Sequence, residues 1–180
     1  NTQFLAVSTV TNFRISGLHI IGTLQDDGFP GNETQGRLLL TDCTNCEITN
    51  MRWEKATQAT FINSSNNLRI HHNDYLNTFN PIQTAGGAGT TNVNLWITDN
   101  YFLANDKVPG TTAYDDQIAT FAGPTGRLEI SRNVIDLQGP SVKNCCHGIY
   151  VSLAAAQKAQ EVVIADNIIR NNINETALGT

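Results

Sequence analysis

The chain has few charged side chains and no long apolar run. Asp, Glu, Lys and Arg make up 15% of its 180 residues, and aromatic residues only 7%. A typical disordered chain is rich in charge and poor in apolar residues, whereas 40% of this chain is hydrophobic. A membrane-spanning helix needs roughly 18 consecutive apolar residues, and no stretch approaches that length. We therefore expect a single folded domain over residues 1–180, without a membrane span.

Basic residues are also scarce. The 11 Lys and Arg are outnumbered by 16 Asp and Glu, which gives a formal net charge of −5. Because nucleic-acid binding needs clustered cations, we expect no nucleic-acid partner. Uncharged polar residues are abundant instead, with 21 Asn and 21 Thr. Asn tolerates the left-handed backbone conformation, so this composition favours short β-strands joined by tight corners.

One pattern of eight residues, which we call the eight-residue repeat, occurs six times. Its third residue is always Ile, its sixth is Asn in four copies, and its eighth is large and apolar. The copies span residues 13–20, 46–53, 68–75, 95–102, 128–135 and 162–169. Apolar residues at the first and third positions indicate a strand with one buried face. We expect the Asn to turn the chain and the eighth residue to begin a second strand on the same core.

The spacing of the copies predicts a β-solenoid, in which each coil stacks on its neighbours. The repeated isoleucines are 22 to 34 residues apart. They are Ile15, Ile48, Ile70, Ile97, Ile130 and Ile164. A third strand is expected before each later copy, at 38–40, 59–62, 81–84, 117–120 and 148–151, with short turns such as 41–45 between. The long insertions, with the exception of residues 153–160, then leave from one corner, where they would form the wall of a cleft.

The repeat, with Asn at its corner, resembles the right-handed parallel β-helix of the pectin-lyase-like superfamily over about residues 13–173. This resemblance implies an all-β fold of about six coils, centred near the six isoleucines. The superfamily includes polygalacturonases, polysaccharide lyases, epimerases and phage tailspike depolymerases. It therefore implies a polysaccharide partner and an extracellular, secreted or virion-surface location. Members are usually longer and capped, so we expect a segment of a longer protein whose flanking domains, or a homotrimer, cover its ends.

Two candidate catalytic groups fall on neighbouring coils. The residues just before the third strands form a column of Arg37, Gln58, Asn80, Asp116 and His147. Coils stack at about 4.8 Å, which places Asp116 beside His147, with Asp115 adjacent. Carboxylates beside an imidazole are suited to general acid–base attack on a glycosidic bond. The alternative is that the aspartates cap a turn and that His147 bonds to the backbone.

Two short sequence motifs also resemble those of the polygalacturonase family, namely Asp115-Asp116 and His147-Gly148, each followed by a strand. The resemblance implies that Asp115 or Asp116 is the general acid or base and that His147 supports it. The family's Asn-Thr-Asp motif is replaced here by Asn80-Pro81-Ile82, and its Arg-Ile-Lys motif is missing.

A second candidate surface is formed by the outward second residues of the repeat. They are Arg14, Glu47, Arg69, Trp96, Glu129 and Val163. An outward Trp stacks well on a sugar ring, so Trp96 with Arg69 is a candidate saccharide-binding pair. Tyr114, Tyr150 and Lys143 are further substrate-binding candidates near the aspartates. The alternative is that Trp96 packs beneath a loop or against another subunit. Trp53, at the eighth position, is expected in the core.

The sequence predicts no metal site and no cofactor. His71 and His72 are consecutive strand residues, which point to opposite faces and should not share one ion. Calcium is the alternative, with Asp74 and Asp99 as the candidate pair.

Four cysteines occur as two close pairs, Cys43 with Cys46 and Cys145 with Cys146. The pairs should lie roughly 15–19 Å apart, too far for a disulfide between them. Any disulfide must be local, and Cys43–Cys46 is the more plausible one. Cys46 falls on an inward position, where it should behave as a small hydrophobic residue.

These features favour an extracellular enzyme that hydrolyses an acidic polysaccharide at Asp115 or Asp116. Three alternatives stay open: a polysaccharide lyase, a non-catalytic carbohydrate-binding or adhesin segment that uses Trp96, and a purely structural β-helix. The fold alone does not choose among them, because one scaffold hosts many activities.

Overall fold

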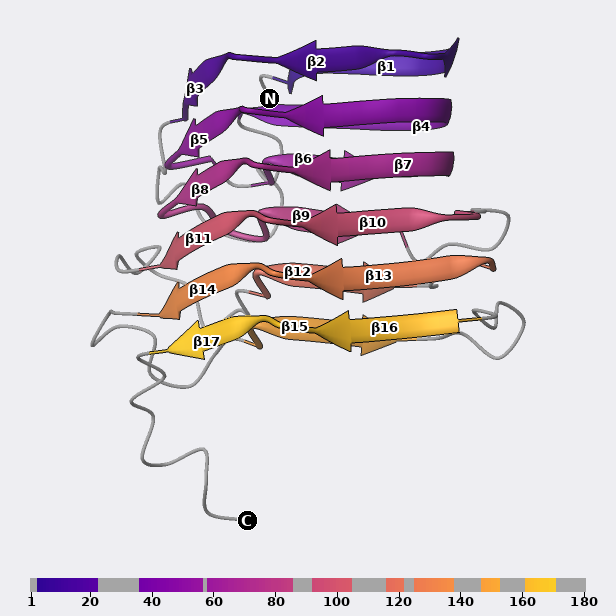
Figure 1. Ribbon diagram of the computed structural model, residues 1–180. Coiled ribbons are helices and arrows are strands. Elements are labelled where there is room, and N and C mark those ends of the chain that lie inside the picture. Colours follow the sequence, from indigo (N-terminus) through magenta and orange to yellow (C-terminus); the bar gives the residue numbers. More distant parts are fainter. Residues whose placement is uncertain are drawn as a thin grey trace.

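The computed structural model describes residues 3–22, 36–56, 58–85, 92–104, 116–121, 125–137, 147–152 and 161–170. Within these ranges the regular structure consists of β-strands alone, and no helix is long and apolar enough to cross a membrane. Figure 1 shows the strands stacked in layers that follow the order of the chain, from the N-terminal layer to the C-terminal layer. The fold is all-β, with strongly curled parallel sheets.

The larger sheet has eleven strands in the order β15-β12-β9-β6-β4-β7-β10-β13-β16, with β1 and β2 both paired to β4. Its strands are β1 (Gln3–Thr11), β2 (Arg14–Ser16), β4 (Arg37–Thr49), β6 (Thr60–Ile62), β7 (Ser65–His71), β9 (Ile82–Thr84), β10 (Leu95–Thr98), β12 (Ile118–Phe121), β13 (Arg127–Ser131), β15 (Ile149–Ser152) and β16 (Glu161–Ala165). Each pairing is parallel, so neighbouring strands are joined through the rest of a layer rather than by a hairpin.

The smaller sheet has six strands in the order β17-β14-β11-β8-β5-β3. They are β3 (His19–Ile21), β5 (Arg52–Glu54), β8 (Asp74–Leu76), β11 (Tyr101–Ala104), β14 (Val134–Leu137) and β17 (Ile168–Arg170). Each of these strands comes directly after a strand of the larger sheet, such as β8 after β7 and β11 after β10. The eight-residue repeat therefore forms one strand of each sheet and the corner between them.

The isoleucines of the repeat lie in the register that the sequence predicted. Ile97 pairs with Ile70 on one side and with Ile130 on the other, and all three are fully buried. Ile48 and Ile15 continue this column at one end, and Ile164 at the other. The predicted third strands are also present, as β6, β9, β12 and β15 and as the first part of β4.

Strand β4 differs from the prediction. The turn expected at 41–45 lies inside one continuous strand, Arg37–Thr49. Asp42 and Asn45 have φ angles of 52° and 54°, so single left-handed residues bend the chain there. Such isolated residues change its direction without ending the parallel pairing with β7.

The corner of the repeat also differs from the prediction. The left-handed residue is the fifth of each copy rather than the sixth. These residues are Gly17, Asn50, His72, Asp99, Arg132 and Asp166, with φ between 52° and 76°. The sixth-position residues Asn73, Asn100 and Asn133 are buried inside the corner. There the side-chain amide supplies both a donor and an acceptor to main-chain groups that would otherwise lack partners.

The sixth-position asparagines form a buried asparagine ladder, Asn73–Asn100–Asn133–Asn167. Asn100 Nδ2 donates to the Ile70 carbonyl and to Asn133 Oδ1, both at 3.0 Å. Asn133 Nδ2 donates in the same way to Ile97 and Asn167, at 2.9 and 3.0 Å. The ladder links successive layers at the corner, in addition to the strand hydrogen bonds.

Aromatic rings on the second strands of successive central layers stack on one another. Trp53 and Tyr75 have ring centroids 5.0 Å apart with planes inclined by 4°. Tyr75 and Phe102 follow at 4.8 Å and 7°. All three rings are fully buried, which confirms the core position predicted for Trp53. Parallel pairing brings equivalent residues of successive layers together at a spacing that suits stacked rings.

Candidate functional site

Asp116 and His147 form a hydrogen-bonded pair. His147 Nδ1 lies 2.8 Å from Asp116 Oδ1, and the main-chain N–H of His147 donates to the same oxygen at 3.2 Å. Both residues lie two positions before a strand, and the register Ile118↔Ile149 sets those strands side by side. The predicted neighbour relation is therefore confirmed. The carboxylate is also bonded to a main-chain N–H, as the turn-capping alternative required.

The two partners differ sharply in exposure. Asp116 is buried, with 7% of its surface exposed, whereas the His147 side chain is 56% exposed. A buried carboxylate that accepts the Nδ1–H of an imidazole holds the ring in one tautomer, which leaves Nε2 as a proton acceptor. The pair has the arrangement of a general base with its orienting carboxylate.

Aromatic side chains border this pair. The Tyr150 ring lies 5.3 Å from the His147 ring and 5.4 Å from the Phe121 ring, measured between centroids. Tyr150 is thus where the sequence predicted a stacking residue. The candidates Asp115, Tyr114 and Lys143 lie outside the described residues.

The predicted column of residues just before the third strands is wrong by one residue at Arg37. The register Leu38↔Thr60 sets Arg37 beside Ala59, whereas Gln58 lies one position earlier. Gly36, with φ of 73°, takes the corner position in this layer. Arg37 still reaches Gln58, since its Nη1 donates to Gln58 Oε1 at 3.1 Å.

The predicted outward column exists. Trp96 pairs with Arg69 on one side and with Glu129 on the other. The Arg69 guanidinium carbon lies 5.4 Å from the centre of the Trp96 ring, a cation–π contact. Trp96 is partly exposed and Arg69 is exposed. The pair therefore presents a flat ring and a positive charge on one surface.

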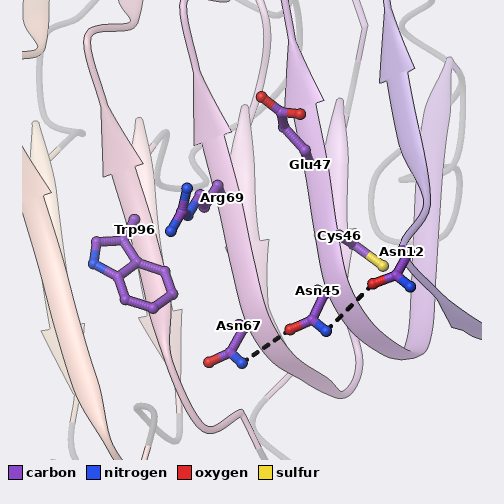
Figure 2. Close-up of a pocket in the computed structure, with 7 residues that line it drawn as sticks. All are labelled: Asn12, Asn45, Cys46, Glu47, Asn67, Arg69 and Trp96. Carbon is purple, nitrogen blue, oxygen red and sulfur yellow. Dashed lines mark hydrogen bonds between the residues drawn. The ribbon is translucent and has the colours of Figure 1, made fainter.

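A groove of about 510 Å³ runs beside this pair. It is lined by Asn12, Asn45, Cys46, Glu47, Asn67, Arg69 and Trp96. Figure 2 shows the asparagines in line along one edge, with Arg69 and Trp96 on neighbouring strands. Neither Asp116 nor His147 lines it, so the sequence-predicted binding residues Arg69 and Trp96 occupy a different surface from the candidate catalytic pair.

Three asparagines at the groove edge, Asn12, Asn45 and Asn67, continue beyond it to Asn94, and we call these four the surface asparagine row. Asn45 Nδ2 donates to Asn12 Oδ1 at 3.3 Å, and Asn67 Nδ2 donates to Asn45 Oδ1 at 3.0 Å. Asn94 Nδ2 donates to Asn67 Oδ1 at 2.7 Å. The sequence reasoning missed this row, although each Asn directly precedes a copy of the repeat.

The two charged residues of the groove, Glu47 and Arg69, differ in their ion pairs. Glu47 is paired with Arg14, at 3.2 Å, and with His71 Nε2, at 2.8 Å. Arg69 makes no ion pair with any residue that the structure describes, and it contacts the Trp96 ring instead. Because Glu47 is already engaged by Arg14 and His71, Arg69 gives this part of the groove a positive character.

The predicted separation of His71 and His72 is wrong. Their Nδ1 atoms lie 2.7 Å apart. His72 has a φ of 55°, so it leaves the strand geometry in which consecutive side chains point to opposite faces. The structure does not support the calcium alternative at Asp74 and Asp99, because both Asp99 oxygens accept hydrogen bonds from Arg132 at 2.7 and 2.8 Å.

Cys43 and Cys46 are buried free thiols, so the local disulfide that the spacing allowed is not formed. Burial, together with the neighbouring Cys46, raises the pKa of the Cys43 thiol to about 12. Cys46 lies in the core, as expected for a small hydrophobic side chain. Cys145 and Cys146 lie outside the described residues.

Comparisons with models of known families, with curated proteins and with solved structures gave no significant match. Function must therefore be argued from the geometry of the two surfaces.

Proposed function

We propose that the two curled sheets belong to a right-handed parallel β-helix of about six coils, of the pectin-lyase-like kind. Three features support this fold: parallel pairing throughout, a column of six isoleucines, and corners bridged by the buried asparagine ladder. A scaffold of this kind offers long flat faces, along which a linear polymer can lie across several layers.

On this scaffold the groove binds a polysaccharide chain. The proposal rests on one observation: Trp96, Arg69 and three members of the surface asparagine row, Asn12, Asn45 and Asn67, line the same groove. The apolar face of a sugar ring stacks on an indole, and its hydroxyl groups pair with amide donors and acceptors. The protein is then a saccharide-binding protein with an extracellular, secreted or virion-surface location.

The charge of the groove specifies an acidic polysaccharide. The Arg69 guanidinium has donors suited to a carboxylate, and charge-assisted bonds are about twice as strong as neutral ones. A uronate residue stacked on Trp96 would bring its carboxylate toward Arg69, which the cation–π contact holds beside the ring.

Titration calorimetry over a panel of acidic and neutral oligosaccharides tests the proposal. We expect Trp96→Ala to weaken binding about tenfold or more, and Trp96→Phe to weaken it less. Arg69→Gln should reduce affinity for acidic ligands about tenfold and leave neutral ones unchanged. Phe61→Ala is a matched control, since Phe61 is a partly exposed aromatic residue outside the groove. Binding by Trp96→Ala equal to wild type, or no binding by wild type, rejects the proposal.

A second candidate function is hydrolysis of the polysaccharide at Asp116 and His147, favoured by their 2.8 Å hydrogen bond. His147 Nε2 would take a proton from the attacking water, while Asp116 holds the imidazole. Asp115, the second carboxyl in the sequence, would protonate the leaving oxygen, so that water is added across the glycosidic bond.

Release of reducing ends tests this function, and ultraviolet absorbance of unsaturated ends distinguishes a lyase. We expect Asp116→Asn, Asp115→Asn and His147→Ala each to lower the hydrolytic rate about 100-fold or more. Trp96→Ala should raise KM more than it lowers kcat. Full activity in the double variant Asp115→Asn/Asp116→Asn rules out this catalytic assignment and leaves the binding function untouched.

A further inference from the structure

Two imidazole nitrogens converge at the corner between β7 and β8. The Nδ1 atoms of His71 and His72 lie 2.7 Å apart, and the two rings meet edge to face at 83°. His71 is the last residue of β7, and His72 is the left-handed corner residue with φ of 55°. Thr49 of the neighbouring layer adds an oxygen, since its Oγ1 is 3.2 Å from His71 Nδ1.

The protonation of this pair follows from the partner on the far side of His71. Glu47 Oε1 lies 2.8 Å from His71 Nε2, and a carboxylate oxygen accepts hydrogen bonds. With a hydrogen on Nε2, the Nδ1 atom of His71 acts as an acceptor, and Thr49 Oγ1 and His72 Nδ1 both lie next to it. At 2.7 Å the two Nδ1 atoms are joined by one hydrogen bond, and a metal ion that displaces its hydrogen would meet both nitrogen lone pairs.

We propose that His71 and His72 form a binding site for a divalent transition-metal ion, best suited to Cu²⁺, with Glu47 as the carboxylate that orients His71. Histidines that bind metals usually donate their other ring N–H to a carboxylate, as His71 does to Glu47. Arg14, 3.2 Å from Glu47, holds that carboxylate in place. Thr49 Oγ1 and water molecules would complete the coordination.

The separation of the nitrogens is compatible with adjacent positions on one copper ion. Two nitrogens about 2.0 Å from one ion are roughly 2.8 Å apart in adjacent square-planar positions and roughly 3.3 Å apart in a tetrahedron. The observed 2.7 Å is close to the square-planar value. Cu²⁺ prefers this tetragonal geometry and also binds imidazole more tightly than Zn²⁺ does.

The site is reachable from solvent. His72 is exposed, and the His71 side chain is 23% exposed. The charged groups around it are Glu47 and Arg14 on the earlier layers and, on the next layer, Asp99, which is bonded to Arg132. The inference is independent of the proposed saccharide binding.

Titration of the full chain with Cu²⁺ alone tests this site, by calorimetry and by electron paramagnetic resonance. We expect one equivalent of Cu²⁺ with hyperfine coupling from two imidazole nitrogens, and weaker binding of Zn²⁺. His71→Gln and His72→Asn should each lower Cu²⁺ affinity at least about tenfold, and Glu47→Gln about tenfold. Asn is chosen at position 72 because it tolerates the left-handed conformation.

His19 provides the matched control, because it also pairs with a glutamate, Glu54 at 3.4 Å, but has no second imidazole among the described residues. His19→Gln should bind Cu²⁺ as wild type does. Circular dichroism of each variant verifies that the sheets are intact. Wild-type affinity in both His71→Gln and His72→Asn, coupling from one nitrogen only, or no Cu²⁺ binding by the wild type would overturn the proposal.

Discussion

The single Oδ1 atom of Asn100 accepts two hydrogen bonds from Asn73, one from its main-chain N–H at 3.1 Å and one from its side-chain amide at 2.9 Å. The residues are 27 positions apart in the chain and lie at the same corner of successive layers. Each amide in the buried asparagine ladder thus satisfies groups of the layer before it and passes its own donor to the layer after it.

Removing a central amide from this ladder should destabilise the protein strongly. Asn100→Leu leaves the Asn73 N–H buried without a partner and removes one buried donor from the Ile70 carbonyl. Each such group costs about 1–3 kcal/mol, so we expect a loss of about 3–5 kcal/mol in the free energy of unfolding. Urea denaturation followed by circular dichroism measures this loss.

Asn167→Leu is the matched control, because Asn167 makes the same kind of bonds to Asn133 but is only partly buried. Water can reach the groups freed there, and we expect a loss of about 1–2 kcal/mol. Equal losses at positions 100 and 167 would contradict the role assigned to burial.

The aromatic stack should depend on the Tyr75 ring rather than on its hydroxyl. The ring lies between Trp53 and Phe102, while the hydroxyl is 3.5 Å from Thr60 Oγ1. Tyr75→Leu leaves a cavity and should cost about 2–4 kcal/mol, whereas Tyr75→Phe should cost about 1 kcal/mol or less. Thermal unfolding of the two variants measures the difference. If both lose the same stability, the hydroxyl bond is the main contribution.

Asp99 should make stability depend on pH in the acid range. Hydrogen bonding to Arg132 lowers the pKa of Asp99 below its usual value. A carboxyl whose pKa is lower in the folded state stabilises the fold above its unfolded pKa, near 4, and this contribution is lost as pH falls through the folded pKa. The pair is partly exposed, so we expect Asp99→Asn to cost only about 0.5 kcal/mol at pH 7.

Urea denaturation of wild type and Asp99→Asn at several pH values measures this contribution. The two stability curves should converge in acid, and 1 M salt should narrow their separation at neutral pH. A constant difference between the curves at all pH values would mean that the charge of Asp99 is not its source.

Cys43 and Cys46 should resist alkylation in the folded protein. The thiolate is the reactive species, and burial raises the pKa of Cys43 to about 12. At pH 8 we expect iodoacetamide to modify neither residue in native buffer and both in guanidinium chloride. Mass-spectrometric peptide mapping distinguishes them from Cys145 and Cys146. Labelling in native buffer at the rate of an unfolded control would contradict the buried positions.

The strand order could be predicted because the repeat fixes it. An invariant Ile at one position sets the register of every neighbouring layer, and that register places Asp116 beside His147 and Arg69 beside Trp96. These pairs depend on position alone, and parallel stacking brings equivalent positions together whatever the residue types are.

The features that the sequence did not predict depend on the backbone conformation of single residues. The left-handed corner is occupied by Gly, Asn, His, Asp and Arg, so no residue type marks it. The strand rule that separated His71 from His72 fails where φ becomes positive. The column through Arg37 shifted by one because Gly36 takes the corner there.

The two ends of the stack are unequally covered. Ile15 and Ile20 of the first layer are each 8% exposed, whereas Val162, Ile164, Ile168 and Ile169 of the last layer are between 40% and 55% exposed. Strands β16 and β17 also close the order of their sheets, each with a neighbour on one side. Loss of structure should therefore be directional. Amide deuterium uptake should begin in β16 and β17 and advance layer by layer toward β7, so that the groove beside Arg69 is the last surface to come apart.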